Sequence, residues 1–301
     1  MANTDHILTL IQSGNHTALA KEADERPKLF DDKHWYSAVG TGRTDICSPL
    51  VHAGLSPKKT RFDRTPLHFA AYFHKLDIVK WLLEVDADPN KPDGAGYKPL
   101  DLAYEFSENE PSPELVDALA EAGTEISIWT AVRMGRLDRC KSILEESPDL
   151  INAFSDGMAL TPLMVAVRMN RLSIAQFLIE SGANVNAVGP VESGELGGNT
   201  VLWYAAQGGR MDREAVVELL LAHGAQVDVA GEGGWTALHM ASQWNHPGIA
   251  RLLIEKGANK ASLDGGGRTP LEIAQKYESR DVVNFLSTLS EHLYEGPSRF
   301  T

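Results

Sequence analysis

The chain has 301 residues, 43% of them hydrophobic, and its 28 Lys and Arg against 41 Asp and Glu give a formal net charge of −13. This charge argues against general binding to nucleic acid or to an anionic membrane surface. No stretch approaches the length of about 18 apolar residues that spans a bilayer, and the first residues lack a secretory pattern, so we expect a cytoplasmic protein. The two cysteines, Cys47 and Cys140, occupy apolar helix positions and read as buried thiols in a reducing compartment.

A helical motif that recurs along the chain has its clearest copy between Asp63 and Leu83. Thr65 can cap a helix, and Pro66 suits the first helical position because no backbone N–H is needed there. The residues that follow place a narrow apolar stripe on one face. A second apolar helix ends near a polar turn that contains Pro89. Such a pair cannot bury its own apolar face and needs copies of itself.

Copies of the opening occur at Thr161-Pro162-Leu163, Thr200-Val201-Leu202, Thr236-Ala237-Leu238-His239 and Thr269-Pro270-Leu271, with a variant at Lys98-Pro99-Leu100. Second helices that match the one after Thr65 are followed by Gly182-Ala183, Gly224-Ala225 and Gly257-Ala258. Glycine suits the left-handed residue that ends a helix. With Thr-Pro-Leu-His opening it and Gly-Ala closing it, the unit resembles the ankyrin repeat, whose period is about 33 residues.

The resemblance implies an all-α solenoid of about nine helix-turn-helix units with short β-hairpin fingers between them. We expect one array over residues 1–290 and a C-terminal tail over 291–301. The expected units are 1–30, 31–60, 61–93, 94–124, 125–156, 157–194, 195–231, 232–264 and 265–290.

Three segments depart from the regular pattern. Residues 105–113 lengthen the loop inside the fourth unit and make it acidic, and residues 188–198 enlarge a finger with turn-forming residues. Around residues 124–128 there is almost no room for a finger, which predicts a deleted finger or a break in the stack. Insertions in repeat proteins map to loops on particular faces.

No catalytic motif is recognisable, and the ten histidines are dispersed. We interpret His68 and His239 as packing residues, because the resemblance implies a hydrogen-bonded histidine at this position. Glycines 231, 233 and 234 and 265–267 precede helix openings and read as turns instead of phosphate loops. Cys140 shares the apolar register of its helix, which favours burial over reactivity. We therefore expect no enzyme activity, no cofactor and no metal.

The resemblance also implies that partner contacts come from the residues that follow the small residues of each first helix, and from the finger residue before each threonine. These positions are rich in aromatic side chains, Met and Arg, the types enriched at protein interfaces. The predicted partner-binding residues are Arg64, Tyr72, Phe73, Tyr97, Phe106, Arg133, Met134, Arg168, Met169, Trp235, Trp244 and Tyr277. Local irregularity could instead bury some of them.

The sequence thus predicts a non-catalytic scaffold or adaptor, a monomer in isolation, that binds a protein or peptide through its concave face and fingers. Arg133 and Arg168 would form a small positive island, which suggests an acidic partner. Neither nucleic acid nor membrane is expected as a partner. Two alternatives remain open. Residues 105–113 or 188–198 could carry a small-ligand or enzymatic role, or the chain could be a constitutive subunit of a larger assembly.

Overall fold

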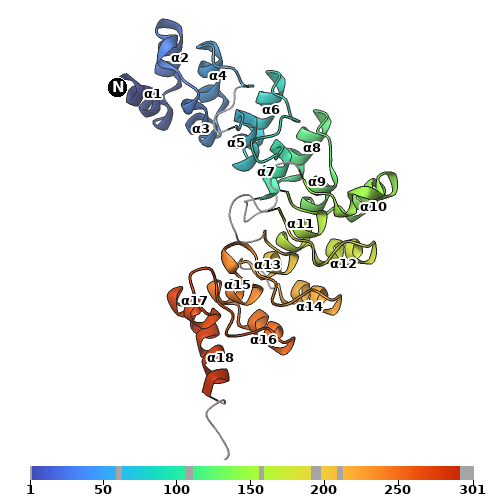
Figure 1. Ribbon diagram of the computed structural model, residues 1–301. Helices are drawn as coiled ribbons and strands as arrows, with labels where there is room; N and C mark the ends of the chain where they lie inside the picture. The colour runs from blue at the N-terminus through green and yellow to red at the C-terminus, as the bar shows by residue number, and fades with distance from the viewer. Residues whose placement is uncertain are drawn as a thin grey trace, which may run out of the picture. The chain divides into compact units, whose positions relative to one another are not determined.

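The structure is a computed structural model that describes residues 2–58, 63–105, 111–155, 159–190, 198–208 and 213–291. These residues contain eighteen α-helices in nine consecutive pairs, and no extended strand is formed among them. The pairs follow one another along the chain in Figure 1. The expected all-α class is therefore confirmed.

The first helices of the pairs are α1 (Ala2–Gln12), α3 (Lys33–Gly40), α5 (Pro66–Tyr72), α7 (Pro99–Glu105), α9 (Ile128–Arg133), α11 (Pro162–Arg168), α13 (Val201–Ala206), α15 (Ala237–Gln243) and α17 (Pro270–Lys276). The second helices are α2 (His16–Glu25), α4 (Thr44–His52), α6 (Leu76–Glu84), α8 (Pro113–Glu121), α10 (Leu137–Glu146), α12 (Leu172–Glu180), α14 (Glu214–Ala222), α16 (Pro247–Glu255) and α18 (Arg280–Glu291). Three 3₁₀ turns complete the described elements: η1 (Pro27–Leu29), η2 (Pro148–Asn152) and η3 (Glu232–Gly234).

The first helices begin where the threonines predict. The hydroxyl of Thr161 accepts a hydrogen bond from the Met164 N–H at 3.2 Å, and Thr200 does the same for Trp203 at 3.0 Å. These contacts satisfy N–H groups that have no partner inside the helix. Ala70 and Ala71 are fully buried, so the small residues of α5 lie in the core.

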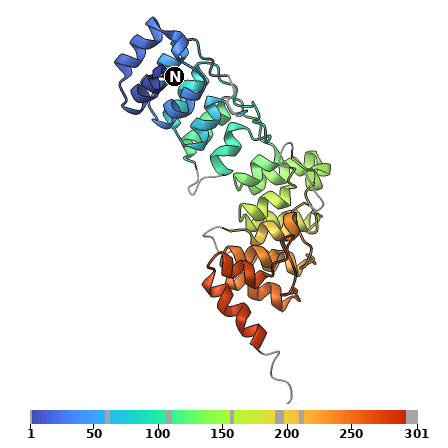
Figure 2. The same ribbon diagram turned by 60° about the vertical axis from the view of Figure 1, so that its left-hand side comes forward.

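The chain divides into two compact units, one ending at Thr130 and the other beginning at Ala131, within α9. In the first unit α3 packs on α5 and α5 on α7, while α2, α4, α6 and α8 form a parallel series of contacts. In the second unit α11, α13, α15 and α17 pack in sequence, and so do α10, α12, α14, α16 and α18. Figure 2 shows the helices of each unit from another side. That the repeats form one continuous array stays a prediction.

The fingers that precede α7 and α17 are tight turns, each closed by two backbone hydrogen bonds. The N–H of Asp93 donates to the carbonyl of Tyr97 at 2.8 Å, and the N–H of Asp264 donates to that of Arg268 at 2.9 Å. The carbonyls of Asp93 and Asp264 also accept from the N–H groups of Gly96 and Gly267, both at 2.9 Å. Val188 and Thr200 form an isolated antiparallel bridge. The described part of the chain therefore holds turns at these places instead of the expected paired strands.

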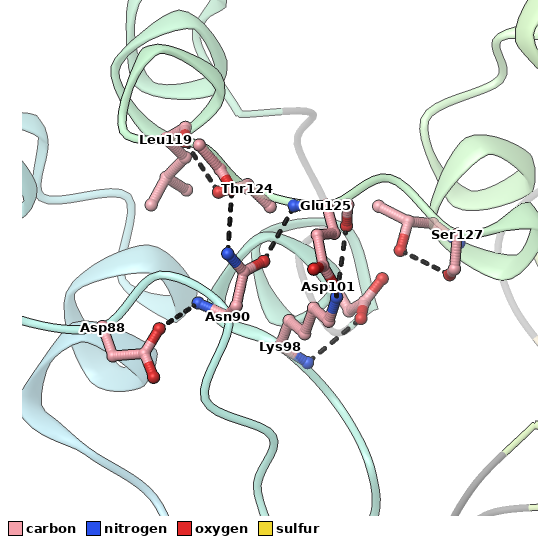
Figure 3. A network of polar contacts seen from close by, with 10 residues as sticks. Asp88, Asn90, Lys98, Asp101, Leu119, Thr124, Glu125 and Ser127 are labelled. Carbon is pink, nitrogen blue, oxygen red and sulfur yellow. Dashed lines mark hydrogen bonds and ion pairs between the residues drawn. The ribbon is translucent and has the colours of Figure 1, made fainter.

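Asparagine side chains link the ends of successive second helices. The amide of Asn90 donates to the carbonyl of Gly123 and accepts from the N–H of Glu125, both at 2.8 Å, as Figure 3 shows. In the second unit Asn186 bridges Gly224 and Gln226 in the same way, at 3.0 and 2.8 Å. Because a carbonyl just past a helix end has no helical partner, each amide completes the end of the next second helix.

Asp228 stands at this position in the next pair, where it accepts from the N–H of Asn259 at 3.0 Å but has no donor for the carbonyl of Gly257. We predict that Asp228→Asn raises the free energy of unfolding by about 1 kcal/mol, because the amide adds the missing hydrogen bond. Urea unfolding measures the change. The matched control is Asn186→Asp, which removes the donor from an intact link and should destabilise by a similar amount. A fall in stability for Asp228→Asn would contradict this account.

Candidate functional site

Four aromatic side chains, from α3, from α5 and from the residue that directly follows α5, form a continuous cluster in the first unit. The Tyr36 ring meets the rings of Phe69 and Phe73 edge-on, with centroids 5.0 and 5.3 Å apart, and Phe73 meets Tyr72 at 5.0 Å. Edge-to-face contacts of this length stabilise aromatic pairs beyond the effect of burial. We call Tyr36, Phe69, Tyr72 and Phe73 the aromatic cluster.

The helices place these rings together for a simple reason. Phe69 and Phe73 are four residues apart, so they lie on one face of α5, and α3 packs beside that helix. Phe69 is buried, whereas Tyr72 and Phe73 are half-buried and Tyr36 leaves 47% of its surface exposed. The cluster is therefore anchored in the fold and open to solvent at its outer edge.

A hollow of about 290 Å³ adjoins the aromatic cluster at the finger between α6 and α7. Its lining residues are Arg64, Phe69, Asp93, Gly94 and Ala95. The Arg64 Nε donates to the Asp93 carboxylate at 2.9 Å, and that carboxylate also accepts from the N–H groups of Ala95 and Tyr97. Phe69 belongs to both features, so the finger hollow and the aromatic cluster adjoin each other.

The structure brings together three of the predicted contact residues, Arg64, Tyr72 and Phe73. Tyr97 lies in the same finger but is only 3% exposed, and its carbonyl accepts a hydrogen bond from His68. Its ring therefore offers almost no contact surface. Phe106 lies outside the described residues.

The other predicted residues lie in the second unit. Arg133 is 3% exposed, so its side chain adds little to any surface. Met134, Arg168, Met169 and Trp235 are half-buried. Trp244 and Tyr277 are 46% and 44% exposed. The Trp244 ring rests on Gly208, where an added Cβ would come within 2.1 Å of it.

The sequence reasoning missed two members of the aromatic cluster, the buried Phe69 and the exposed Tyr36. In the unit of Tyr36, the positions that follow the small residues of α3 hold Gly40 and Thr41, so the repeat pattern does not point to Tyr36. Tyr36 stands one turn earlier, where the next unit has His68, and Lys33–Trp35 lacks the Thr-Pro opening. A large aromatic residue at a position that holds histidine in the next repeat is the signal that could have found it.

The histidines of the repeats are structural in the described residues. His68 is fully buried, its Nδ1 accepts from the N–H of Thr65 at 3.1 Å, and its Nε2 donates to the carbonyl of Tyr97 at 3.0 Å. His239 repeats both bonds with Thr236 and Arg268. Burial lowers the pKa of each imidazole. These contacts agree with a packing role.

The two cysteines are buried in the described part of the chain. Burial raises the pKa of Cys47 to about 12 and that of Cys140 to about 11, so neither thiol ionises near neutral pH. Over the described ranges no group of three or more His, Cys, Asp or Glu residues could hold a metal ion. No helix in these ranges has the length and apolar character needed to cross a membrane.

Comparison of the sequence with known proteins assigns the chain to a family. The model for ankyrin repeats, three copies long, matches residues 34–128, 107–189 and 190–264. A mouse homolog of the B-cell lymphoma 3 protein is 29% identical over 223 residues, which are 74% of this chain and 42% of that protein. A putative palmitoyltransferase of Danio rerio is 30% identical over 222 residues, 73% of this chain and 28% of its own length.

An ankyrin repeat-containing protein of Schizosaccharomyces pombe is 33% identical over 84 residues, 28% of this chain and 39% of the relative. The chain therefore matches less than half the length of each of these relatives. Ankyrin repeats generally mediate protein–protein interaction. Some of the relatives are named as enzymes, as the putative palmitoyltransferase is. Because the family model matches the sequence from residue 34 to residue 264 and the Thr-capped helices recur along it, the chain belongs to the ankyrin-repeat family.

Proposed function

We propose that the chain is a non-catalytic adaptor of the cytoplasm that binds a protein or peptide partner through the aromatic cluster and the adjoining finger hollow. The observation that carries the proposal is the open edge of the cluster, where Tyr36 is 47% exposed although it is held by two ring contacts. Exposed aromatic side chains fixed in place are typical hot spots, because a partner buries them at little cost in side-chain entropy.

The finger hollow supports the same surface. Arg64 donates from Nε to the Asp93 carboxylate, and 32% of its side chain stays exposed. Arginine is enriched at hot spots together with Tyr and Trp. A partner that lies across α3 and α5 would therefore meet a fixed aromatic edge and a fixed cation side by side.

The test is a triple substitution, Tyr36→Ser, Tyr72→Ser and Phe73→Ser, in the full chain. Truncating three hot-spot aromatics should weaken binding at least 100-fold, at about 1 to 2 kcal/mol or more for each. Affinity purification from the source cells should recover the partner with the wild type and lose it with the variant, and titration of that partner then measures the change in Kd.

The matched control is Phe154→Ser, Leu172→Ser and Leu263→Ser, which removes three exposed apolar side chains elsewhere, at 47%, 40% and 61% exposure. This variant should retain the partner. Circular dichroism and thermal unfolding must show that both variants are folded. The proposal fails if the folded cluster variant binds every partner with the same Kd as the wild type.

The alternatives stay predictions. Most of 105–113 and of 188–198 lies outside the described residues, so no described geometry speaks for a ligand or catalytic role there. A role as a constitutive subunit would use the second helices, and a hollow of about 290 Å³ between α10, η2 and α12 is the feature that such an assembly would cover. The purified chain should be monomeric if the adaptor proposal holds.

A further inference from the structure

An apolar hollow of about 290 Å³ lies between α10 and α12 of the second unit, and we call it the α10–α12 hollow. Its apolar lining consists of Leu144, Pro148, Ile151 and Phe177. Leu144 is buried, whereas Ile151 and Phe177 are half-buried, so apolar surface stays open to solvent. Small-molecule sites measure about 300 to 1,000 Å³, and the hollow therefore suits one large side chain of a partner.

The 3₁₀ turn η2 follows α10 and forms one wall of the hollow. Because such a turn has three residues per turn, Pro148 and Ile151 lie on one side of it. The Asn152 amide donates to the carbonyl of Gly182 at 3.3 Å and accepts from the N–H of Asn184 at 2.8 Å. These two bonds join η2 to the end of α12, so the hollow is already formed in the free chain.

Exposed carboxylates stand at one end of the hollow. Glu145 and Glu146 lie in the last turn of α10 and Asp149 lies in η2, and none of them makes an ion pair with a residue that the structure describes. Lys141, four residues before Glu145, extends over the Phe177 ring instead, with its Nζ 5.8 Å from the ring centroid. The Glu145 carboxylate, which lines the hollow, is therefore available to a partner.

The carboxylates at the end of α10 stand where a helix does not favour them. The C-terminal end of a helix carries about half a negative charge, which favours cations, yet the last turn of α10 contains no basic residue. From residue 142 to residue 167 the sequence has no Lys or Arg. In α16, by contrast, Lys256 directly follows Glu255. A departure from local preference that no described residue offsets is typical of a functional surface.

We propose that the α10–α12 hollow binds a basic segment of a protein partner. One large apolar side chain of that segment enters between Leu144, Ile151 and Phe177, and a neighbouring Lys or Arg pairs with Glu145. The argument is charge complementarity around an apolar centre. A second copy of the chain, with its net charge of −13, would add negative charge at this place, as would nucleic acid or an anionic membrane. The inference goes beyond the proposed function, because this surface does not use the aromatic cluster.

The experiment measures, by fluorescence anisotropy, how the purified full chain binds a fluorescein-labelled peptide in which one phenylalanine stands between two runs of three lysines. This phenylalanine peptide should bind with a Kd below about 1 mM, and added NaCl should weaken it because exposed charges are screened. The same peptide with serine in place of phenylalanine should bind at least about tenfold more weakly, because it buries no large side chain. A peptide with glutamates in place of the lysines should not bind.

Two single variants test the hollow directly. Ser181 is exposed and directly follows α12, so Ser181→Phe can fill the hollow without disturbing the core. Glu145→Lys reverses the charge at its edge. Each should weaken binding of the phenylalanine peptide about tenfold. The matched controls are His223→Phe, at the residue that directly follows α14, and Glu255→Lys, at the ninth residue of α16 as Glu145 is of α10. Both controls should bind as the wild type does.

The inference is overturned if the phenylalanine peptide gives no anisotropy change up to millimolar chain, if the serine peptide binds equally well, or if the two control variants lose as much affinity as the hollow variants. The triple variant of Tyr36, Tyr72 and Phe73 should bind the phenylalanine peptide as the wild type does. A failure of the hollow is therefore distinguishable from a failure of the aromatic cluster, because the variants of each surface leave the other intact.

Discussion

Replacing His68 by alanine is expected to lower the free energy of unfolding by about 3 kcal/mol. The imidazole is fully buried and joins the start of α5 to the following finger through Thr65 and Tyr97. Its removal leaves a buried N–H and a buried carbonyl without partners, each of which costs about 1 to 3 kcal/mol, and adds a cavity. Urea unfolding followed by circular dichroism measures the loss.

His68→Asn is the matched control, because the asparagine oxygen can still accept from Thr65 while the bond to Tyr97 is lost. It should cost less than alanine. A loss below about 1 kcal/mol for His68→Ala would show that the two contacts do not couple the repeats.

The same residue makes stability depend on pH. Because burial lowers its pKa in the folded chain, the unfolded chain binds a proton more readily below about pH 6.5. The contribution of neutral His68 is complete above that pH and is lost as the pH falls through the lowered pKa. His68→Asn should therefore show a shallower loss of stability on acidification than the wild type, with His239 accounting for part of what remains.

Much of the fold could be predicted because the repeat leaves local marks. Thr65, Thr161, Thr200, Thr236 and Thr269 each stand directly before the helix they were expected to open. The fingers were harder to predict, because the turn from Asp93 to Tyr97 is closed by two backbone hydrogen bonds within the turn and forms no strand. Local sequence sets helix starts but does not set how neighbouring turns pair.

The candidate site was predictable only in part. Tyr72 and Phe73 follow the small residues of α5, so the repeat pattern finds them. Tyr97 occupies a finger position that the pattern marks as exposed, but the adjoining contacts of Asp93 and His68 draw it into the core. Exposure depends on contacts from other repeats, and a pattern read within one repeat does not contain them.

A buried contact of α3 with another repeat determines where Tyr36 lies. Trp35 is 2% exposed and packs against Trp81 of α6 with ring centroids 6.3 Å apart. It fixes α3 in the stack, and the next residue, Tyr36, therefore meets α5 in one orientation. The aromatic cluster depends on this buried indole, although the indole is not part of the exposed surface.

Trp35→Ala is accordingly expected to cost about 3 to 5 kcal/mol of the free energy of unfolding, the range for emptying a large buried aromatic site. Trp35→Phe should cost far less, about 1 kcal/mol, because it keeps a ring and removes an indole N–H that has no hydrogen-bond partner among the described residues. Denaturant unfolding of the two variants measures the difference in the free energy of unfolding. The partner should no longer bind the alanine variant and should still bind the phenylalanine variant. Equal costs for the two substitutions would mean that the indole does not hold α3, and Tyr36 would then owe its position to α5 alone.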